Sequence, residues 1–243
     1  MRHNFVRPAH HFWLGLLPGV CLLAVALARG APPPPSTDDQ LWDETRLTYK
    51  LTPEFNVFTA GEFRLTDDFG YWGRTSGRVG MGWQPLSNFT IMPSYLYTVD
   101  DPASSTSRVE STLCLLTSYR IPIKTATFTL LNTTEYRMPE GLPASWRLRP
   151  KCVLSQPIGP DNLGLSGFIA NEGFYDEGRN AWTQDRVFGG LEKKLGSYAD
   201  VELYYCREFN FPSNRPDFNV IGITVRLTFG PKKLPTPDEP DTQ

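Results

Sequence analysis

The histidines are the first residues to consider for chemistry, and they are confined to one end of the chain. The protein has 243 residues and three histidines, and His3, His10 and His11 all lie within the first 28 residues. Histidine acts most often as a general base or a metal ligand, because its unperturbed pKa lies nearest to neutrality. The rest of the chain therefore lacks the Ser–His and Asp–His pairs typical of hydrolytic sites. We predict no catalytic, metal or cofactor site, and we expect that the protein is not an enzyme.

Three cysteines lie beyond residue 28, namely Cys114, Cys152 and Cys206. Their wide spacing matches no pattern of zinc ligands, and no histidine is near enough in sequence to complete one. We interpret them as small apolar side chains. Alternation within their segments predicts that Cys114 and Cys206 point inward and that Cys152 points outward.

Arginine, lysine and glutamate carry the remaining chemistry, because they recur at alternate positions that would share one face of a strand. By this parity the basic members are Arg46, Lys50, Arg64, Arg74, Arg78, Arg108, Arg120, Arg137, Arg147, Arg149, Lys151, Arg186 and Arg226. The acidic members are Glu44, Glu62, Glu110, Glu135, Glu172, Glu192, Asp200, Glu202 and Glu208. Basic residues are in excess on this face, although the net charge of the whole chain is −2.

A two-residue period must position these side chains. In residues 219–229, large apolar side chains occupy every odd position from Ile221 to Phe229, and Gly, Thr and Arg occupy even ones. The same alternation recurs in segments of about ten residues along the body of the chain, and no stretch has a sustained helical period. We therefore predict an all-β protein, an antiparallel up-and-down transmembrane β-barrel over residues 39–229.

Two features favour a membrane barrel over a soluble sandwich, which also shows alternation. Segments of about ten residues match the length that crosses hydrocarbon at a tilt, whereas soluble strands average about five or six. Aromatic residues such as Trp83, Phe89, Trp146 and Trp182 gather near segment ends, where membrane barrels carry their interfacial girdles. The alternate charged positions would then face the lumen, since only a closed ring can expose an apolar face to lipid.

The amino-terminal segment predicts export. Arg2 and Arg7 precede an apolar run that ends at Ala26-Leu27-Ala28, which is the order of a cleaved secretory signal. We predict a signal peptide at residues 1–28, a Pro-rich spacer at 29–38, the barrel at 39–229 and a polar Pro-rich tail at 230–243. The expected location is the bacterial outer membrane. A net charge of −2 predicts no nucleic-acid partner.

Four segments carry a resemblance to a known family. They are Gln40-Leu41-Trp42, Gly61-Glu62-Phe63-Arg64-Leu65, Val201-Glu202-Leu203-Tyr204-Tyr205 and the alternating residues 219–229. Over residues 38–229 the chain resembles the bacterial domain-of-unknown-function 2490 family of predicted outer-membrane barrels. The resemblance implies an outer-membrane barrel and no established catalytic residue.

The last segment resembles the terminal signal that the bacterial barrel-assembly machinery reads. Its residues are Gly222, Val225, Leu227 and Phe229. We therefore predict that machinery and outer-membrane lipid as partners of a monomer.

The number of strands is open between ten and twelve, and we favour twelve. Single-chain bacterial barrels have an even number of strands. The pattern of short turns and longer loops, however, makes the first and last segments run in the same direction. A missed strand in the region 139–160, a misread first strand or a spacer threaded through the lumen would each account for this.

Two interpretations of the lumen remain open. In one, surplus arginines line a narrow water-filled channel for small anionic solutes, as in anion-selective pores. In the other, Arg–Glu ladders fill a non-conducting structural or partner-binding barrel, because buried charges must be paired. A soluble periplasmic β-protein is the third alternative.

Overall fold

The computed structural model describes residues 37–102, 106–211 and 216–230. Within these ranges the chain forms eleven strands and two short 3-10 helices. The strands are β1 (Thr37–Lys50), β2 (Phe55–Thr66), β3 (Tyr71–Leu86), β4 (Phe89–Asp100), β5 (Arg108–Ile123), β6 (Ala126–Pro139), β7 (Ser145–Pro157), β8 (Leu165–Asp176), β9 (Ala181–Leu195), β10 (Ala199–Asn210) and β11 (Asp217–Phe229), and the 3-10 helices are η2 (Asp161–Leu163) and η3 (Glu177–Arg179). The described residues include no helix both long and apolar enough to cross a membrane.

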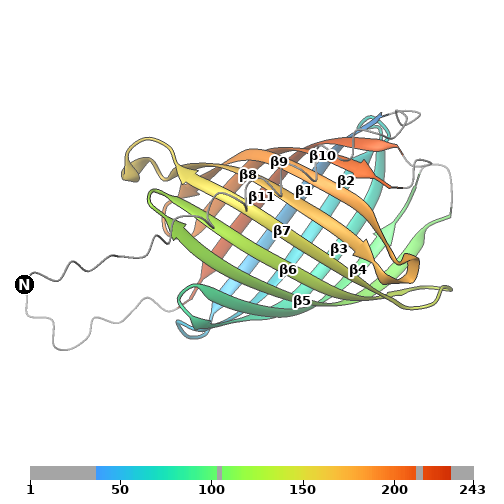
Figure 1. Ribbon diagram of the computed structural model, residues 1–243, viewed down its shortest axis with the longest axis horizontal. Coiled ribbons are helices and arrows are strands. Elements are labelled where there is room, and N and C mark those ends of the chain that lie inside the picture. Colours follow the sequence, from blue (N-terminus) through green and yellow to red (C-terminus); the bar gives the residue numbers. More distant parts are fainter. Residues whose placement is uncertain (1–36, 103–105, 212–215, 231–243) are drawn as a thin grey trace, which may run out of the picture. The chain divides into compact units, whose positions relative to one another are not determined.

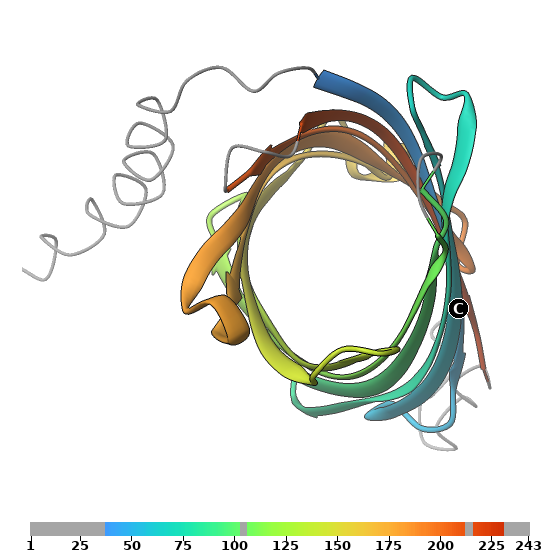
Figure 2. The same ribbon diagram turned by 90° about the vertical axis from the view of Figure 1, so that its right-hand side faces the viewer.

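The strands close into one barrel in sequence order (Figure 1), and the end-on view shows the ring (Figure 2). Each strand pairs antiparallel with its neighbours in sequence, and β1 closes the ring by pairing parallel with β11. The parallel register runs from Thr37 opposite Asp217 to Tyr49 opposite Phe229. The prediction of an all-β up-and-down barrel is confirmed, with one parallel pair at its closure.

Eleven strands lie within the expected range and number one fewer than the twelve that we favoured. The first and last strands do run in the same direction, as the turn pattern required. The parallel β1–β11 pair makes this possible without a missing strand, because the region 139–160 holds only the end of β6, all of β7 and a connection. The predicted signal peptide and the spacer up to residue 36 lie outside the described residues, as does the tail beyond Gly230.

The barrel has two rims. The loop rim, where β1 begins, carries the connections 67–70, 101–107, 140–144, 177–180 and 211–216. The turn rim, where β11 ends, carries 51–54, 87–88, 124–125, 158–164 and 196–198. The connections at the two rims differ less in length than the sequence predicted. Strands extend into residues that were expected to be loops, and the connection 158–164 at the turn rim is long.

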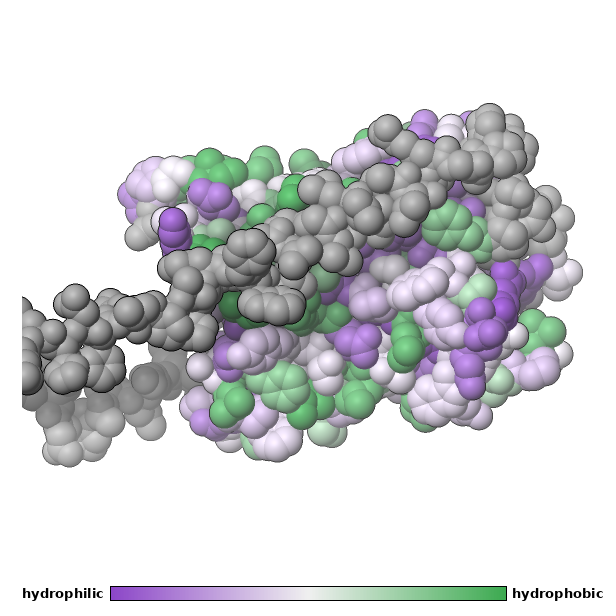
Figure 3. All heavy atoms as spheres, in the orientation of Figure 1, coloured by the Kyte–Doolittle hydropathy of each residue, from purple (hydrophilic) through white to green (hydrophobic). Residues whose placement is uncertain are grey.

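The outward face is mainly apolar. Val79 and Ile221 are 56% and 49% exposed, and Met81, Leu113 and Leu203 are exposed as well. No second layer of the described chain covers Ile221 or Ile223, both of which are exposed. Figure 3 shows apolar residues along the barrel wall and hydrophilic residues gathered toward the right-hand end. Alternation therefore places large apolar side chains over most of the exterior and most of the charged side chains inside the ring.

One sector of the outward face differs from the rest. On β8 and β9, the amide of Asn171 donates to Asp185 at 2.8 Å. Across β10, β11 and β1, Arg207 donates to Asn219 at 2.6 Å, and Asn219 donates to Asp39 at 2.8 Å. We call these five residues the polar sector, and it lies nearer to the loop rim than to the turn rim.

The hydrophobic core lies inside the ring. Trp42, Ala170, Phe188, Cys206 and Val220 form a buried cluster from β1, β8, β9, β10 and β11. These side chains share the inward parity of the charged residues. A barrel of this size can be filled by side chains, and this core fills part of it.

Candidate functional site

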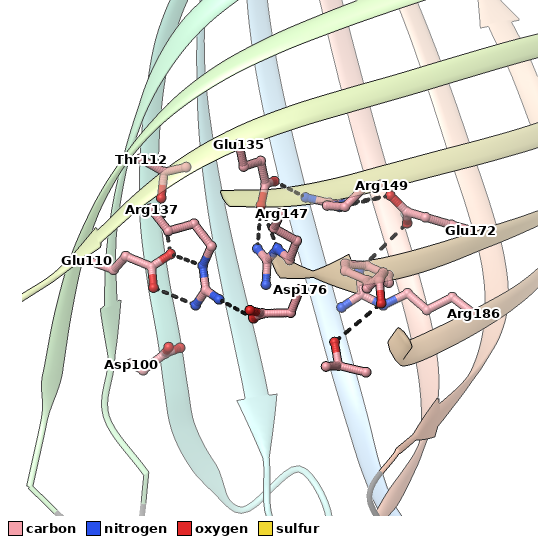
Figure 4. Close-up of polar contacts among 12 residues, drawn as sticks. Asp100, Glu110, Thr112, Glu135, Arg137, Arg147, Arg149, Glu172, Asp176 and Arg186 are labelled. Atoms are coloured by element: carbon pink, nitrogen blue, oxygen red, sulfur yellow. Dashed lines mark hydrogen bonds and ion pairs between the residues drawn. The ribbon is translucent and has the colours of Figure 1, made fainter. Parts of the chain in front are cut away.

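The candidate site is a chain of ion pairs inside the barrel, which we call the ladder (Figure 4). It consists of Arg147, Glu135, Arg149, Glu172, Arg186 and Glu208, which come from β6 to β10. Adjacent strands supply successive members because inward positions face each other across each pair. Glu135 lies opposite Arg147, and Arg186 lies opposite both Glu172 and Glu208.

Most contacts in the ladder are short and charge-assisted. Arg147 Nε donates to Glu135 Oε2 at 2.7 Å, and Arg149 Nη1 donates to Glu135 Oε1 at 2.6 Å. Arg149 Nη2 reaches Glu172 at 2.8 Å, and Arg186 Nε reaches Glu208 at 2.6 Å. The pair between Arg186 and Glu172 is longer, at 3.8 Å. Each carboxylate therefore serves two arginines or an arginine and an amide, since Gln184 also donates to Glu208.

Two aromatic rings support the ladder from inside the lumen. The guanidinium groups of Arg149 and Arg186 lie 4.7 and 4.5 Å from the centroid of the Phe174 ring. Arg186 also lies 4.7 Å from the Trp42 ring, and Arg64 on β2 lies 3.8 Å from that same ring. Trp42 thus stands between β2 and β9, which are not neighbours in the ring. The contact of Arg186 with Trp42 therefore links β9 to β1 past the two strands that lie between them.

Smaller clusters continue the ladder around the ring. Arg137 donates two hydrogen bonds to Glu110, and it also pairs with Asp176 at 3.4 Å. Arg64 pairs with Glu62, Arg74 with Asp100, and Arg226 with both Glu192 and Glu202. Charge pairing thus extends to most of the ring.

The carboxylates of the ladder are more buried than those of the other clusters. The side chains of Glu135 and Glu208 are 0% and 1% exposed, whereas those of Arg226 and Glu192 are 34% and 35% exposed. Burial removes the solvation of a charge by water, and only well-placed ion pairs and hydrogen bonds offset this cost in free energy. The ladder meets that requirement, because its carboxylates accept two or more hydrogen bonds each. The ladder therefore places fixed, mutually neutralised charges inside the ring along β6 to β10.

The structure brings together most of the predicted lumen residues but leaves several apart. Among the described residues, Arg78, Arg108 and Glu44 form no ion pair. Arg46 stacks on Phe58 instead, with its Cζ 3.9 Å from the ring centroid. Arg108 is exposed at the start of β5. A small pocket lined partly by Glu44, Glu62 and Arg78 has about 10 Å³ of space, enough for a single water.

Parity in the sequence missed Asp100, Asp176 and the ring of Phe174 as parts of these clusters. Asp100 and Asp176 are the last residues of β4 and β8, where the sequence suggested loops. Extending the alternation by a few residues would have found them. The partners of each arginine depend on strand register, which alternation alone does not determine.

The three cysteines beyond residue 28 are not members of the ladder. Cys114 and Cys206 are buried, and Cys152 is partly buried on the outward side of β7. Within the described ranges, no group of three or more His, Cys, Asp or Glu side chains could hold a metal ion. The ion pairs of the ladder link side chains of five adjacent strands.

Comparison with known proteins adds the family. A family model described as "Protein of unknown function (DUF2490)" matches residues 39–219. The chain belongs to the DUF2490 family. In this DUF2490 protein the match covers β1 to β10 and the first residues of β11, so that it includes every member of the ladder. No curated protein matches the chain.

Proposed function

We propose that this DUF2490 protein is a non-conducting bacterial outer-membrane barrel whose lumen is closed by the ladder. The single observation that carries the proposal is the complete burial and pairing of Glu135 and Glu208 inside a closed ring. A conducting pore needs charges that water and ions can reach, whereas these carboxylates are occupied by arginines. The ladder interpretation is therefore favoured over the anion channel.

The outward face supports residence in a membrane. Exposed Val79, Met81 and Leu203 belong to an apolar surface on a ring that satisfies its own backbone hydrogen bonds. Lipid hydrocarbon accepts such a ring, because no strand edge remains unpaired. Stacked Phe55 and Trp83 lie at the turn rim, and Tyr136 packs on Trp146 near the loop rim. These pairs fit the two aromatic girdles of a membrane barrel.

The test is conductance of the purified, refolded protein in planar bilayers under two salt gradients. We expect no discrete current steps over repeated insertions, with insertion checked by heat-modifiable migration of the protein recovered from the bilayer lipid. Steps with anion selectivity would overturn the closed lumen and favour the channel instead. Recovery of the mature protein in the soluble periplasm would overturn the location.

The polar sector favours a second candidate, in which the barrel binds a partner from the side. Arg207, which pairs with Asp217 at 3.1 Å, and Asp185 lie on a face where charge in contact with lipid is unfavourable, although near a rim the cost for a cation falls to about 0–1 kcal/mol. A partner protein would shelter them. A photo-crosslinker at position 185 in intact cells should then give a discrete protein adduct that the same group at Val79 does not. Lipid adducts alone at both positions would exclude this contact.

A further inference from the structure

The wall of the lumen changes character between the ladder and the turn rim. Inward positions there carry Met92 on β4, Leu116 on β5, Leu131 on β6, Val153 on β7 and Phe168 on β8. On β6, β7 and β8 each of these lies nearer to the turn rim than that strand's ladder residue. These five side chains are only partly buried, whereas Phe174 and Trp42, which contact the ladder, are buried. Part of the apolar surface of this wall is therefore accessible to solvent.

Strand register aligns these side chains along a diagonal rather than in one continuous row, because Leu116 lies directly opposite Thr133 and Leu131 lies directly opposite Ser118. Met92 lies opposite Leu116, and Leu131 lies opposite Lys151. Val153 follows Lys151 on the same face of β7, and it packs against the buried cluster together with Phe168. An apolar strip therefore runs over five adjacent strands inside the ring.

Several inward cations toward the turn rim form no carboxylate ion pair among the described residues. Arg46, Arg78 and Lys151 are partly buried, whereas Lys50 and Arg120 are exposed at the rim itself. Lys151 Nζ lies 4.2 Å from the centroid of the Phe188 ring, so that its described contact is also aromatic. The Nε of Arg46 is buried and has no hydrogen-bond partner in the described part of the chain. A buried donor without an acceptor is costly, and an anion would satisfy it.

Positive charge is concentrated around Arg46. Arg46 lies directly opposite Arg226 on β11, and Ala60 is the only residue between Arg46 and Arg78 in the row across β1, β2 and β3. Like charges opposite each other are destabilising. Arg226 is neutralised by Glu192 and Glu202, whereas Arg46 has Glu44 within electrostatic range but not as an ion pair.

We propose that this part of the lumen binds one amphiphilic anion. Its single acyl chain lies against the apolar strip, and its carboxylate or phosphate head lies at Arg46 and Arg78. The ladder lies at one end of the site, and the turn rim is its entrance. This inference rests on the barrel fold and on these side chains, and it does not depend on membrane residence or on the absence of conductance.

The test uses native mass spectrometry of the purified full-length mature chain in detergent. The probes are palmitate, 1-palmitoyl lysophosphatidate and uncharged hexadecanol. We expect a one-to-one adduct with both anions and at least about tenfold weaker binding of hexadecanol. The relative strength of the two anions reports whether a carboxylate or a phosphate head is preferred. Equal binding of hexadecanol would overturn the role of the arginines, and no adduct with any probe would overturn the site.

Two sets of variants locate the ligand. The double variant Arg46→Gln and Arg78→Gln should weaken palmitate binding about tenfold, whereas Arg108→Gln, at the exposed loop-rim end of β5, should not change it. Leu116→Trp fills the strip and should abolish the adduct, and the matched control Leu115→Trp points outward and should keep it. Equal effects at positions 115 and 116 would place the ligand on the outer surface and overturn the proposal.

Folding of every variant is checked by heat-modifiable migration. Where Leu116→Trp does not fold, Leu131→Trp replaces it, with outward Leu130→Trp as its control. Conductance measured on the same preparations separates the two proposals. A conducting barrel that binds palmitate through Arg46 overturns only the closed lumen, and a silent barrel that binds neither anion overturns only the ligand site.

Discussion

Glu135 illustrates how the interior of the barrel holds its charges. Its two oxygens accept from Arg147 and Arg149 at 2.7 and 2.6 Å, and the side chain is fully buried. Removal of one partner from such a set leaves charge without solvent or counter-charge. Loss of Glu135 would leave Arg147 without a carboxylate partner in the ladder. Arg149 would keep its ion pair with Glu172.

We predict that Glu135→Gln lowers the free energy of unfolding by about 3–5 kcal/mol, because it leaves two buried guanidinium groups short of a counter-charge. The measurement is a urea titration of protein refolded into lipid vesicles. The matched control is Glu192→Gln, whose pair with Arg226 is about one-third exposed on both sides and should cost less than about 1 kcal/mol. Equal losses in the two variants would show that burial of the ladder has no energetic consequence.

The pairing of β10 with β11 shows why glycine occupies one inward position. Gly222 lies opposite Tyr204, and a Cβ built on Gly222 would lie 1.9 Å from Tyr204 Cζ. Gly190 on β9 faces the other side of Tyr204, where an added Cβ would lie 2.7 Å from its Cβ. The tyrosine ring therefore covers backbone that has no side chain of its own. This gives Gly222 a packing role, whereas the sequence suggested a role in the assembly signal.

We predict that Gly222→Val destabilises the barrel by about 1–3 kcal/mol, because the ring of Tyr204 must leave its place. The same substitution in a Tyr204→Ala background should cost much less. The free energy of unfolding of the two single variants and the double variant measures this coupling. If Gly222→Val instead reduces the amount of protein inserted in cells to the same extent in both backgrounds, recognition by the assembly machinery is the role of Gly222.

The strands could be predicted from the sequence, but their partners could not. Period-two alternation is a local property, so that residues 219–229 revealed both a strand and its two faces. Most parts of the ladder could be assigned to one face for the same reason. The ion pairs could not be assigned, because whether Arg149 meets Glu135, Glu172 or both depends on register between strands. Parity could not distinguish Arg46, Arg78 and Lys151, which form no ion pair in the part of the chain that the structure describes, from the arginines of the ladder.

At the scale of the whole molecule, the odd number of strands decides where the chain enters and leaves the barrel. β1 begins at the loop rim and β11 ends at the turn rim. In an even-numbered barrel both ends lie on the same side, as is normal for bacterial single-chain barrels. Odd-numbered membrane barrels are known from mitochondria.

We predict that epitopes placed directly before Thr37 and after Gln243 lie on opposite sides of the outer membrane. Protease added to intact cells should remove the first epitope and leave the second, if the loop rim faces outward, and the reverse holds for the opposite orientation. The control is protease added to lysed cells, which should remove both. Removal of both epitopes from intact cells, or of neither, would contradict the parallel closure.

The closure also constrains the order in which the protein can be built. The hydrogen bond from Asn219 to Asp39 joins residues that are 180 positions apart, and every other neighbouring pair of strands is joined by a short connection. During synthesis, β1 must therefore wait with one unpaired edge until the last strand emerges. Without β11, the sheet would have two edge strands, each with unpaired backbone N–H and C=O groups. Unpaired strand edges of this kind favour association with other chains, so an incomplete barrel is prone to aggregate.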